Sequence, residues 1–306
     1  MGVMLPFLPA VVLLTVAGCA SNPSTSDPLP PPGTDVVIPY PIAHLLGGPA
    51  TYKGLPLVLT SAAEPSVAAV TGVIGVVCIG MSNGNQECDE WLQQVAGAWQ
   101  SEVSPAVRIV NCAVGGHAIE RWIDPTFDAV LWDDCVLRRL PQAGVLLAQV
   151  RVIYHKAADQ FGVGPGGTPL PLFPSAGNNY ELFRTHLGEF AARVKGKFPS
   201  VQAVYTSSRS YGGFNTRPDR GEPQSYEEGH GLNTWLAANP SVDGVWYGWG
   251  AYLWAPACTS GIRNAANVCY DRVDFQADGV HPAQSGRLKI ARMMHDRLRL
   301  HSWYRR

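Results

Sequence analysis

The sequence predicts an α/β protein in which helices cover both faces of a central, mostly parallel sheet, giving a three-layer α/β/α sandwich. Two observations predict it. Short apolar runs rich in β-branched residues alternate along the chain with longer segments of helical periodicity. In addition, 46% of the 306 residues are hydrophobic and 15% are charged, which suits one large buried core better than a disordered chain or a coiled coil. We therefore expect a single domain over residues 36–306.

The predicted elements follow one another as repeated strand-and-helix units. The first strand is the apolar run at residues 73–79, and Gly80 separates it from a helical pattern at 86–99. The other predicted strands are residues 107–113, 150–154, 201–206 and 242–247, and the other predicted helices are residues 127–140, 180–197, 226–238 and 283–300. Functional groups of such sheets gather at the carboxyl ends of the strands, so candidate residues are sought there.

Charge and composition exclude several classes of function. The chain has 23 Lys and Arg against 24 Asp and Glu, a formal net charge of −1, so it has no long-range field to attract nucleic acid. Its 32 glycines and 25 prolines indicate much ordered loop. No motif for a cofactor or a metal stands out, and we expect neither.

The amino terminus has the features of an export signal. Residues 1–18 contain no charged side chain, and their apolar stretch is shorter than the roughly 20 residues that span a bilayer. The segment ends in VAGC at Cys19, which resembles the lipobox of bacterial lipoproteins and implies lipidation of Cys19. Residues 19–35 are then a flexible tether, and Ala20 resembles the sorting position of outer-membrane lipoproteins. The alternative is an ordinary cleaved signal peptide and a secreted protein.

The remaining cysteines are even in number, as expected of a protein exported to an oxidising compartment, and allow up to three disulfides. Cys258 and Cys269 flank a short loop and are the best candidates for one bridge. The partners of Cys78, Cys88, Cys112 and Cys135 stay open. None of them needs a catalytic role, because a serine is the better nucleophile.

That serine is Ser82, in the stretch GMSNG that follows the first predicted strand. A sharp turn between strand and helix exposes a hydroxyl and directs backbone N–H groups at it. Far along the chain, Asp278 and His281 stand three residues apart before the last helix, where Pro282 suits the first helical position. They can supply a base and the acid that orients it, so the three residues form a candidate catalytic triad. Ser82 as a helix cap and Asp278 as a turn former are the ordinary alternatives.

These motifs together resemble those of the SGNH/GDSL hydrolase superfamily. The Gly-x-Ser-x-Gly pattern also suits an α/β-hydrolase, but here the acid and base come from one short loop. The resemblance implies an SGNH/flavodoxin-like sheet, with Ser82 in the first block and Asp278 and His281 in the last. It also makes Gly116 the glycine of the second block, so that the Gly116 and Ser82 backbone N–H groups hold the oxyanion.

The third block departs from the family pattern, which places an Asn after the third strand. Asp159 is the nearest match here. Three alternatives stay open for the missing amide: a protonated Asp159, replacement by Asn178 or Asn179, or two sufficient backbone donors. Loss of one such donor typically costs about 100- to 1,000-fold in rate.

Several other residues are candidates for contact with substrate. Arg209 and Tyr211 follow the fourth predicted strand and either bind an anionic or sugar-like substrate or brace the loop. Trp246, Trp249 and Trp254 either form a carbohydrate platform or pack in the core. The segment YEEG at residues 226–229 resembles a loop of the same superfamily, and we expect a structural role for Glu228 in it.

A metal pair of His155 and Asp159 is a remote alternative, because no third ligand stands nearby in the sequence. The basic segment 287–306 is expected to pack on the sheet as a terminal helix, and a membrane-surface helix is the other interpretation of it.

The sequence therefore predicts an exported, lipid-anchored serine esterase or deacetylase without a cofactor. Its expected partners are an ester-bearing small molecule or an acetylated carbohydrate, and a membrane through the lipid anchor, but no nucleic acid. A non-catalytic glycan-binding lipoprotein on the same fold is the alternative, favoured by the missing third-block Asn.

Overall fold

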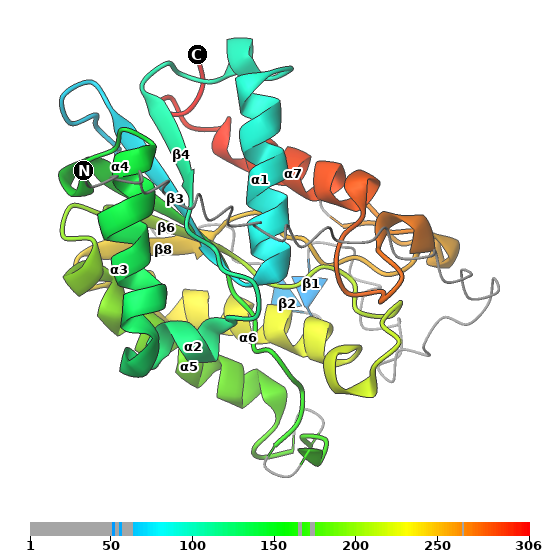
Figure 1. The fold of residues 1–306 in the computed structure, drawn as a ribbon. Helices are drawn as coiled ribbons and strands as arrows, with labels where there is room; N and C mark the ends of the chain where they lie inside the picture. The colour runs from blue at the N-terminus through cyan, green and yellow to red at the C-terminus, as the bar shows by residue number, and fades with distance from the viewer. Residues whose placement is uncertain (1–50, 53–54, 57–63, 165–166, 172–174, 265) are drawn as a thin grey trace, which may run out of the picture.

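The structure is a computed structural model that describes residues 51–52, 55–56, 64–164, 167–171, 175–264 and 266–306 (Figure 1). The expected signal segment, Cys19 and the tether lie outside the described residues. None of the helices within the described residues is long and apolar enough to cross a membrane.

A six-stranded sheet forms the centre of the domain, and the predicted α/β class is confirmed. In spatial order its strands are β4 (Val107–Asn111), β3 (Ile74–Gly80), β5 (Val150–Lys156), β6 (Ala203–Ser207), β8 (Val245–Trp249) and β7 (Ser241–Val242). All neighbours are parallel except the β7–β8 pair. The five parallel strands thus have the order 2-1-3-4-5 of flavodoxin-like folds. A separate short pair joins β1 (Thr51–Tyr52) to β2 (Leu55–Pro56).

Helices flank the sheet on both sides, so the molecule has three layers (Figure 1). The helices are α1 (Ser82–Ala96), α2 (Ile119–Ile123), α3 (Trp132–Asp134), α4 (Leu140–Gln142), α5 (Asn179–Lys197), α6 (Gln224–Ala238) and α7 (Gln284–Leu298). Helices α1 and α7 pack together on one side, while α2, α5 and α6 pack together on the other. Because both faces are covered, every residue of β3 is buried, which explains its continuous apolar run.

The prediction of one α-helix over residues 127–140 is wrong. The segment instead contains a 3-10 helix (Pro125–Val130), the short α3, a π-helical stretch (Cys135–Arg139) and α4. Asp124 begins this segment by accepting a hydrogen bond from the Thr126 N–H, with proline at the next position. The helical path ends at Gln142, and Gly144 follows with φ of 67°, a conformation that favours glycine after a helix.

The strand predicted over residues 242–247 is in fact a hairpin of β7 and β8. Asp243 and Gly244 form the two-residue turn, with φ of 50° and 73°. Positive φ at both central residues is typical of a type I′ turn, whose backbone twist matches that of the two strands of a hairpin. Asp-Gly is a preferred sequence for this turn.

Two helix boundaries also differ from the prediction. Helix α1 begins at Ser82 and not near residue 86, so the candidate nucleophile lies in its first turn. Helix α7 begins at Gln284 after Ala283, so Pro282 precedes the helix and does not occupy its first position. The apolar side of α7 is buried against the domain, as expected of a terminal helix that packs on the fold.

Three disulfides lie within the described residues. The predicted Cys258–Cys269 bridge is confirmed, and the open pairings are Cys78–Cys88 and Cys112–Cys135. Disulfides form and persist in oxidising compartments, so they indicate an extracellular or periplasmic protein.

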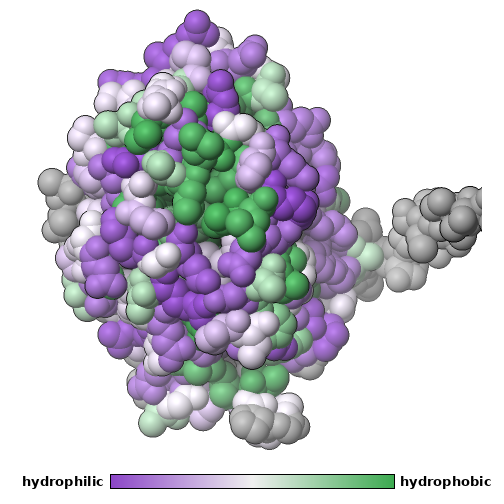
Figure 2. All heavy atoms as spheres, turned by 60° about the vertical axis from the view of Figure 1, so that its left-hand side comes forward, coloured by the Kyte–Doolittle hydropathy of each residue, from purple (hydrophilic) through white to green (hydrophobic). Residues whose placement is uncertain are grey.

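The side of the molecule that lies on the left in Figure 1 is mainly hydrophilic, with a large apolar patch among polar residues (Figure 2). The segment from the 3-10 helix at 125–130 to the loop before β5 has three large apolar side chains that are exposed. They are Val130, Leu137 and Leu146, which are 53%, 77% and 65% exposed.

Candidate active site

The nucleophile candidate lies at the switch point of the sheet. Ser82 follows the carboxyl end of β3. The next two strands of the chain, β4 and β5, lie on opposite sides of β3 in the sheet. Ligands of such sheets bind outside the carboxyl ends of the strands at this point. The fold therefore places Ser82 where a substrate can reach it, and its side chain is half-buried.

The glycines around Ser82 are needed because β5 passes very close to this turn. A Cβ on Gly84 would lie 2.9 Å from the Lys156 Cβ, and a Cβ on Gly80 would lie 2.9 Å from the Lys156 carbonyl oxygen. Both contacts are closer than real Cβ atoms allow. The Gly-x-Ser-x-Gly spacing thus has a steric origin in this chain: it allows the first turn of α1 to lie against the end of β5.

The structure brings the three predicted triad residues together. The His281 Nε2 lies 2.9 Å from the Ser82 Oγ, and the His281 Nδ1 lies 2.5 Å from the Asp278 Oδ2. Because a carboxylate only accepts, Nδ1 donates to it, which leaves Nε2 to accept the serine proton. The side chains of His281 and Asp278 are 27% and 44% exposed, so the base is accessible from solvent.

Asp278 is held in its charged form. Partial burial would raise the pKa of its carboxyl, but hydrogen bonds from the His281 imidazole and from the Val280 and His281 backbone N–H groups outweigh it. The pKa is lowered to about 2. The carboxylate therefore stays negative at any pH at which the imidazole acts as a base, and it can stabilise the imidazolium that forms.

Asn83 joins the two halves of the triad. Its side-chain amide donates to the Val280 carbonyl at 2.8 Å, across 197 residues of sequence, and it is almost fully buried. Asn83 follows the nucleophile and Val280 precedes the base, so this bond fixes the separation of Ser82 and His281. Sequence analysis missed this role, although the residue stands inside the nucleophile motif.

We expect Asn83→Asp to lower kcat by about 10-fold with little change in KM, because small misplacements of reacting groups are costly. The substitution keeps the shape but leaves a carboxylate oxygen facing the Val280 carbonyl. The matched control is Asn239→Asp, which removes a similar amide-to-carbonyl bond at the end of α6. Steady-state kinetics on an activated acetyl ester check this; equal kcat values for the two variants would contradict it.

A buried ion pair joins the helix that carries the nucleophile to strand β5. The Lys156 Nζ lies 3.0 Å from both carboxylate oxygens of Glu87, and both side chains are at most 2% exposed. Burial lowers the pKa of Lys156 against the opposing charge of Glu87. A paired buried charge is costly to break, so the pair fixes α1 against β5. No sequence signal pointed to it, because the two residues are 69 positions apart.

The predicted oxyanion loop lies beside Ser82. A Cβ on Gly115 would be 3.9 Å from the Ser82 Cβ, and Gly116 follows with φ of 76°. Neither glycine N–H donates to another group within the described residues. The Ser82 N–H lies in the first turn of α1, where backbone donors have no partner within the helix. Both expected backbone donors are therefore free for an oxyanion.

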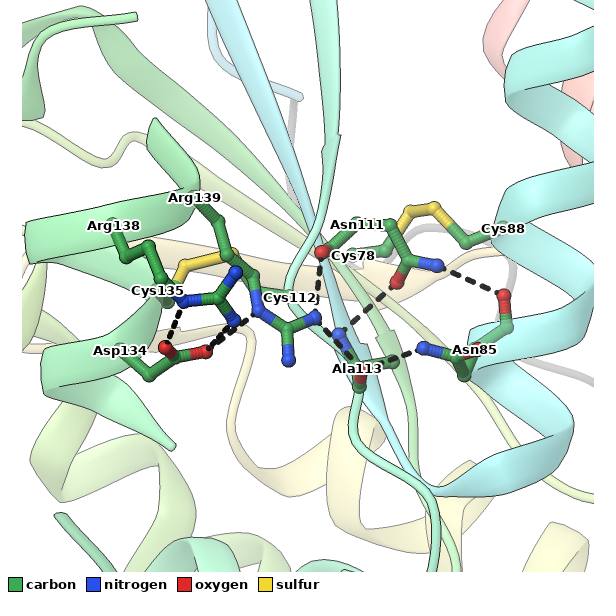
Figure 3. Close-up of a disulfide and its surroundings, with 10 residues drawn as sticks. All are labelled: Cys78, Asn85, Cys88, Asn111, Cys112, Ala113, Asp134, Cys135, Arg138 and Arg139. Atoms are coloured by element: carbon green, nitrogen blue, oxygen red, sulfur yellow. Dashed lines mark hydrogen bonds and ion pairs between the residues drawn. A yellow bond between two sulfur atoms is a disulfide. The ribbon is translucent and has the colours of Figure 1, made fainter. Parts of the chain in front are cut away.

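A set of side-chain bonds ties this loop to α1 (Figure 3). Asn85 donates to the Ala113 carbonyl at 2.8 Å, and Asn111 donates to the Asn85 carbonyl at 2.9 Å. Arg139 donates to the carbonyls of Asn111 and Ala113. The Cys78–Cys88 and Cys112–Cys135 bridges flank these bonds, so the end of β4 is held from both sides (Figure 3).

The oxyanion role expected for Asp159 is corrected by the structure. Its Oδ1 accepts from the His186 Nδ1 at 2.6 Å, and its backbone N–H donates to Glu228. Burial opposes protonation of His186, but the bond to Asp159 and nearby carboxylates outweigh it and raise the pKa of the imidazole. Asp159 therefore anchors the loop after β5. The side chain that packs with Met81, next to the nucleophile, is the methyl of Ala158.

The two asparagines considered as replacements are also engaged elsewhere. Asn178 caps α5 by accepting from the Glu181 N–H, and its amide donates to the Ser175 carbonyl. The Asn179 amide lies 3.5 Å from the Glu228 carboxylate. Of the three alternatives for the missing amide, the backbone donors of Ser82 and Gly116 are the one that this arrangement favours.

The contacts of Arg209 favour the bracing role of the two considered for it. Its Nε donates to Glu228 at 2.9 Å, and a second nitrogen donates to the Asp159 carbonyl. Arg209 and Tyr211 are buried and line a cavity of about 20 Å³ that also touches Met81 and Asn83. Such a cavity holds about one water molecule, which is too small for a sugar.

Glu228 is the buried partner of Arg209. Burial raises the pKa of its carboxyl to about 8, against the opposing charge of Arg209, and nearby Asp159 adds to the rise. An ordinary glutamate has a pKa of 4.5. Between about pH 4.5 and 8 the Glu228 carboxyl is therefore protonated in the folded protein and ionised in the unfolded chain. The stability contributed by Glu228 therefore falls as the pH rises through this window.

We expect Glu228→Gln to remove this pH dependence. The free energy of unfolding of the variant, relative to that of the wild type, should be larger at pH 8.5 than at pH 5, because the amide cannot ionise. Urea denaturation at the two pH values measures it. The exposed Glu189→Gln on α5 serves as the control. The same relative stability at both pH values would show that Glu228 is ionised throughout.

The remaining candidates belong to the core. Trp246, Trp249 and Trp254 are 6%, 0% and 2% exposed, so they form no carbohydrate platform on the surface. His155 stacks on Phe190 with a centroid distance of 3.8 Å, and burial lowers its pKa to about 3. His155 and Asp159 therefore have different partners, and no cluster of metal-ligating side chains occurs within the residues that the structure describes.

Comparisons with known proteins complete the description of the site. No protein-family model and no curated protein matches this chain. Among solved structures, it is similar to a Clostridium thermocellum family 3 carbohydrate esterase, with 13% sequence identity and a TM-score of 0.40. The match covers 74% of this chain and 95% of that chain. The chemistry of the site is therefore derived from its own geometry.

Proposed function

We propose that this protein is an exported serine esterase or deacetylase that acts on small acyl esters. The observation that supports it most strongly is the hydrogen-bonded series from the Ser82 Oγ through the His281 imidazole to the Asp278 carboxylate. Nucleophile, base and orienting acid in this geometry are the recurring arrangement of acyl-transfer enzymes. The resemblance of the motifs to SGNH/GDSL hydrolases favours ester bonds as the target.

The reaction follows from the positions of these groups. The His281 Nε2 takes the Ser82 proton as Oγ attacks the ester carbonyl carbon, and Asp278 stabilises the resulting imidazolium. The Ser82 and Gly116 N–H groups hold the oxyanion of the tetrahedral intermediate. His281 then gives its proton to the leaving alcohol, which departs. A water molecule, deprotonated by the same imidazole, releases the acid and restores Ser82.

O-acetylated glycans are the proposed substrates, on the strength of the motif resemblance and the compartment that the disulfides indicate. The proposed location is the cell envelope, with a lipid on Cys19 as the membrane anchor. Mass spectrometry of the mature amino terminus tests the anchor. A diacylglyceryl-modified peptide beginning at Cys19 is expected, and an unmodified terminus beyond Cys19 would show a secreted protein instead.

The activity itself is tested with the purified full chain and 4-nitrophenyl acetate. We expect hydrolysis that a fluorophosphonate probe abolishes, with the phosphonyl mass found on the peptide that contains Ser82. Activity should persist in EDTA, since no step uses a metal ion. Absence of hydrolysis, or a probe adduct at another serine with loss of activity, would refute the proposed mechanism.

A glycan-binding protein without catalysis is the second candidate. The observation that favours it is that the loop after β5 offers no side-chain amide to an oxyanion: Ala158 packs against Met81, and Asp159 is engaged by His186. Affinity electrophoresis in gels containing acetylated xylan distinguishes the two functions. Retardation in the gel, together with no hydrolysis of either the xylan acetyl groups or the activated ester, would favour the binding protein.

A further inference from the structure

We propose that His117 is a positioning residue of the oxyanion hole: its imidazole fixes the peptide unit between Gly115 and Gly116, and thereby the direction of the Gly116 N–H. The proposal rests on the esterase function proposed above and names a residue that the sequence motifs did not single out. His117 follows the second-block glycines directly.

The segment from Val114 to His117 is a β-turn of defined type. The His117 N–H donates to the Val114 carbonyl at 3.2 Å, and Gly116, the third residue of the turn, has φ of 76°. A positive φ at this position is the mark of a type II turn. The turn is attached to the nucleophile strand, because the Val114 N–H donates to the Gly80 carbonyl at 2.9 Å.

The middle peptide of such a turn has two accessible orientations. Types I and II differ mainly by a rotation of this peptide, which exchanges the directions of its carbonyl and its N–H. Glycine at both central positions removes the Cβ contacts that would otherwise select one orientation. In this chain the middle peptide consists of the Gly115 carbonyl and the Gly116 N–H, so a rotation would present a carbonyl oxygen where an oxyanion needs a donor.

The His117 side chain selects one of these orientations. Its Nδ1 lies 2.8 Å from the Gly115 carbonyl oxygen. A carbonyl only accepts, so Nδ1 carries the proton and donates to it. The Gly115 carbonyl is thereby held on the side of the imidazole. The Gly116 N–H, which is trans to it in the same planar peptide, points the opposite way.

The imidazole is itself held in place by α2 and the segment after it. The Trp122 indole N–H donates to the His117 carbonyl at 3.1 Å. The Phe127 ring meets the imidazole edge to face at 5.7 Å, and the Arg121 guanidinium lies over the same Phe127 ring. The backbone and the ring of His117 are therefore both fixed, so the hydrogen bond to Gly115 has a defined direction.

Two substitutions separate the hydrogen bond from the packing of the ring. His117→Phe keeps an aromatic ring against Phe127 but removes the donor. His117→Asn loses the ring but places an amide N–H near the position of Nδ1. We expect kcat for 4-nitrophenyl acetate to fall about 10-fold or more in His117→Phe, with KM changed less than about twofold, and to stay within about threefold of wild type in His117→Asn. A role in packing alone predicts the reverse order.

A second measurement reports the oxyanion directly. An aryl trifluoromethyl ketone binds a serine hydrolase as an anionic adduct of the nucleophile, so its inhibition constant should rise in His117→Phe by the same factor as kcat/KM falls. Inhibition by the corresponding trifluoromethyl carbinol, which forms no adduct with the nucleophile and carries no oxyanion, should stay unchanged. Equal loss of affinity for both compounds, or wild-type kcat in His117→Phe, would overturn the proposal.

Crystal structures of the two variants keep this result distinct from a failure of the proposed function. In His117→Phe the middle peptide should be rotated or mixed, and in His117→Asn it should stay as in wild type. An inactive wild-type protein would refute the esterase, whereas an unchanged turn in an otherwise folded His117→Phe variant would refute the role of His117.

Discussion

Replacing Ser82 by alanine is expected to lower kcat for 4-nitrophenyl acetate by roughly 10⁴-fold or more, because no covalent acyl-enzyme can form without the hydroxyl. Ser82 is the only described hydroxyl with its Oγ within hydrogen-bonding distance of the His281 Nε2, at 2.9 Å. The side chain is half-buried, so alanine leaves the fold intact. Substrate binding that does not involve the hydroxyl should be retained.

The matched control is Ser101→Ala, an exposed serine in the 3-10 helix after α1. Its kinetic constants should equal those of the wild type. Thermal unfolding of both variants shows whether either substitution disturbs the fold. Equal hydrolysis by wild type and Ser82→Ala would remove the serine mechanism altogether.

The second large effect is expected from Asp278→Asn, which should lower kcat by about 10⁴-fold at neutral pH with little change in KM. The reason lies in the hydrogen bonds of the carboxylate. The Val280 and His281 backbone N–H groups both donate to Oδ1, at 2.9 and 3.0 Å, so the amide oxygen of the variant must occupy that place. The amide nitrogen then faces the His281 Nδ1.

An amide nitrogen donates, so Nδ1 of His281 must accept and the ring proton moves to Nε2. That nitrogen is the one that faces Ser82, and once protonated it cannot act as the base. The exposed Asp243→Asn in the β7–β8 turn is the control and should have wild-type kinetics. Nuclear magnetic resonance of the imidazole nitrogens shows the tautomer; a proton that stays on Nδ1 in Asp278→Asn, with kcat unchanged, would contradict the assignment.

The lowered pKa of Asp278 also sets the sign of its contribution to stability. Its pKa is about 2 in the folded protein and 3.8 ordinarily, so the stability it adds is present above pH 3.8 and is lost as the pH falls towards 2. Loss of activity on moderate acidification therefore cannot come from protonation of Asp278. It must come from a group that titrates at higher pH.

Much of the fold could be predicted from the sequence because its signals are local. The buried strand β3 is a continuous apolar run, and α5 (Asn179–Lys197) begins one residue before its predicted start. The failures also have local causes that were overlooked. The Asp243-Gly244 pair divides the last predicted strand into a hairpin, and the helix predicted over 127–140 is interrupted at Leu131, whose φ of −115° and ψ of −81° are not helical.

The candidate triad could be found from the sequence because each part sits in a short motif after a strand or before a helix. The residues that support it could not. These residues make their hydrogen bonds to partners that are distant in sequence, as Asn83 and Lys156 do, or to a backbone carbonyl, as His117 does. Neither kind of contact leaves a recognisable pattern in the local sequence.

The sequence by itself determined the α/β architecture and named Ser82, Asp278 and His281, because apolar periodicity and short motifs depend only on residues near one another in the chain. Tertiary structure alone decided the use of the polar residues between them. It directed Asp159 to His186 and Arg209 to Glu228, and it packed Ala158 against Met81. The physical reason is that a buried polar group must find a hydrogen-bond partner, and which partner is in reach depends on how the strands and helices pack.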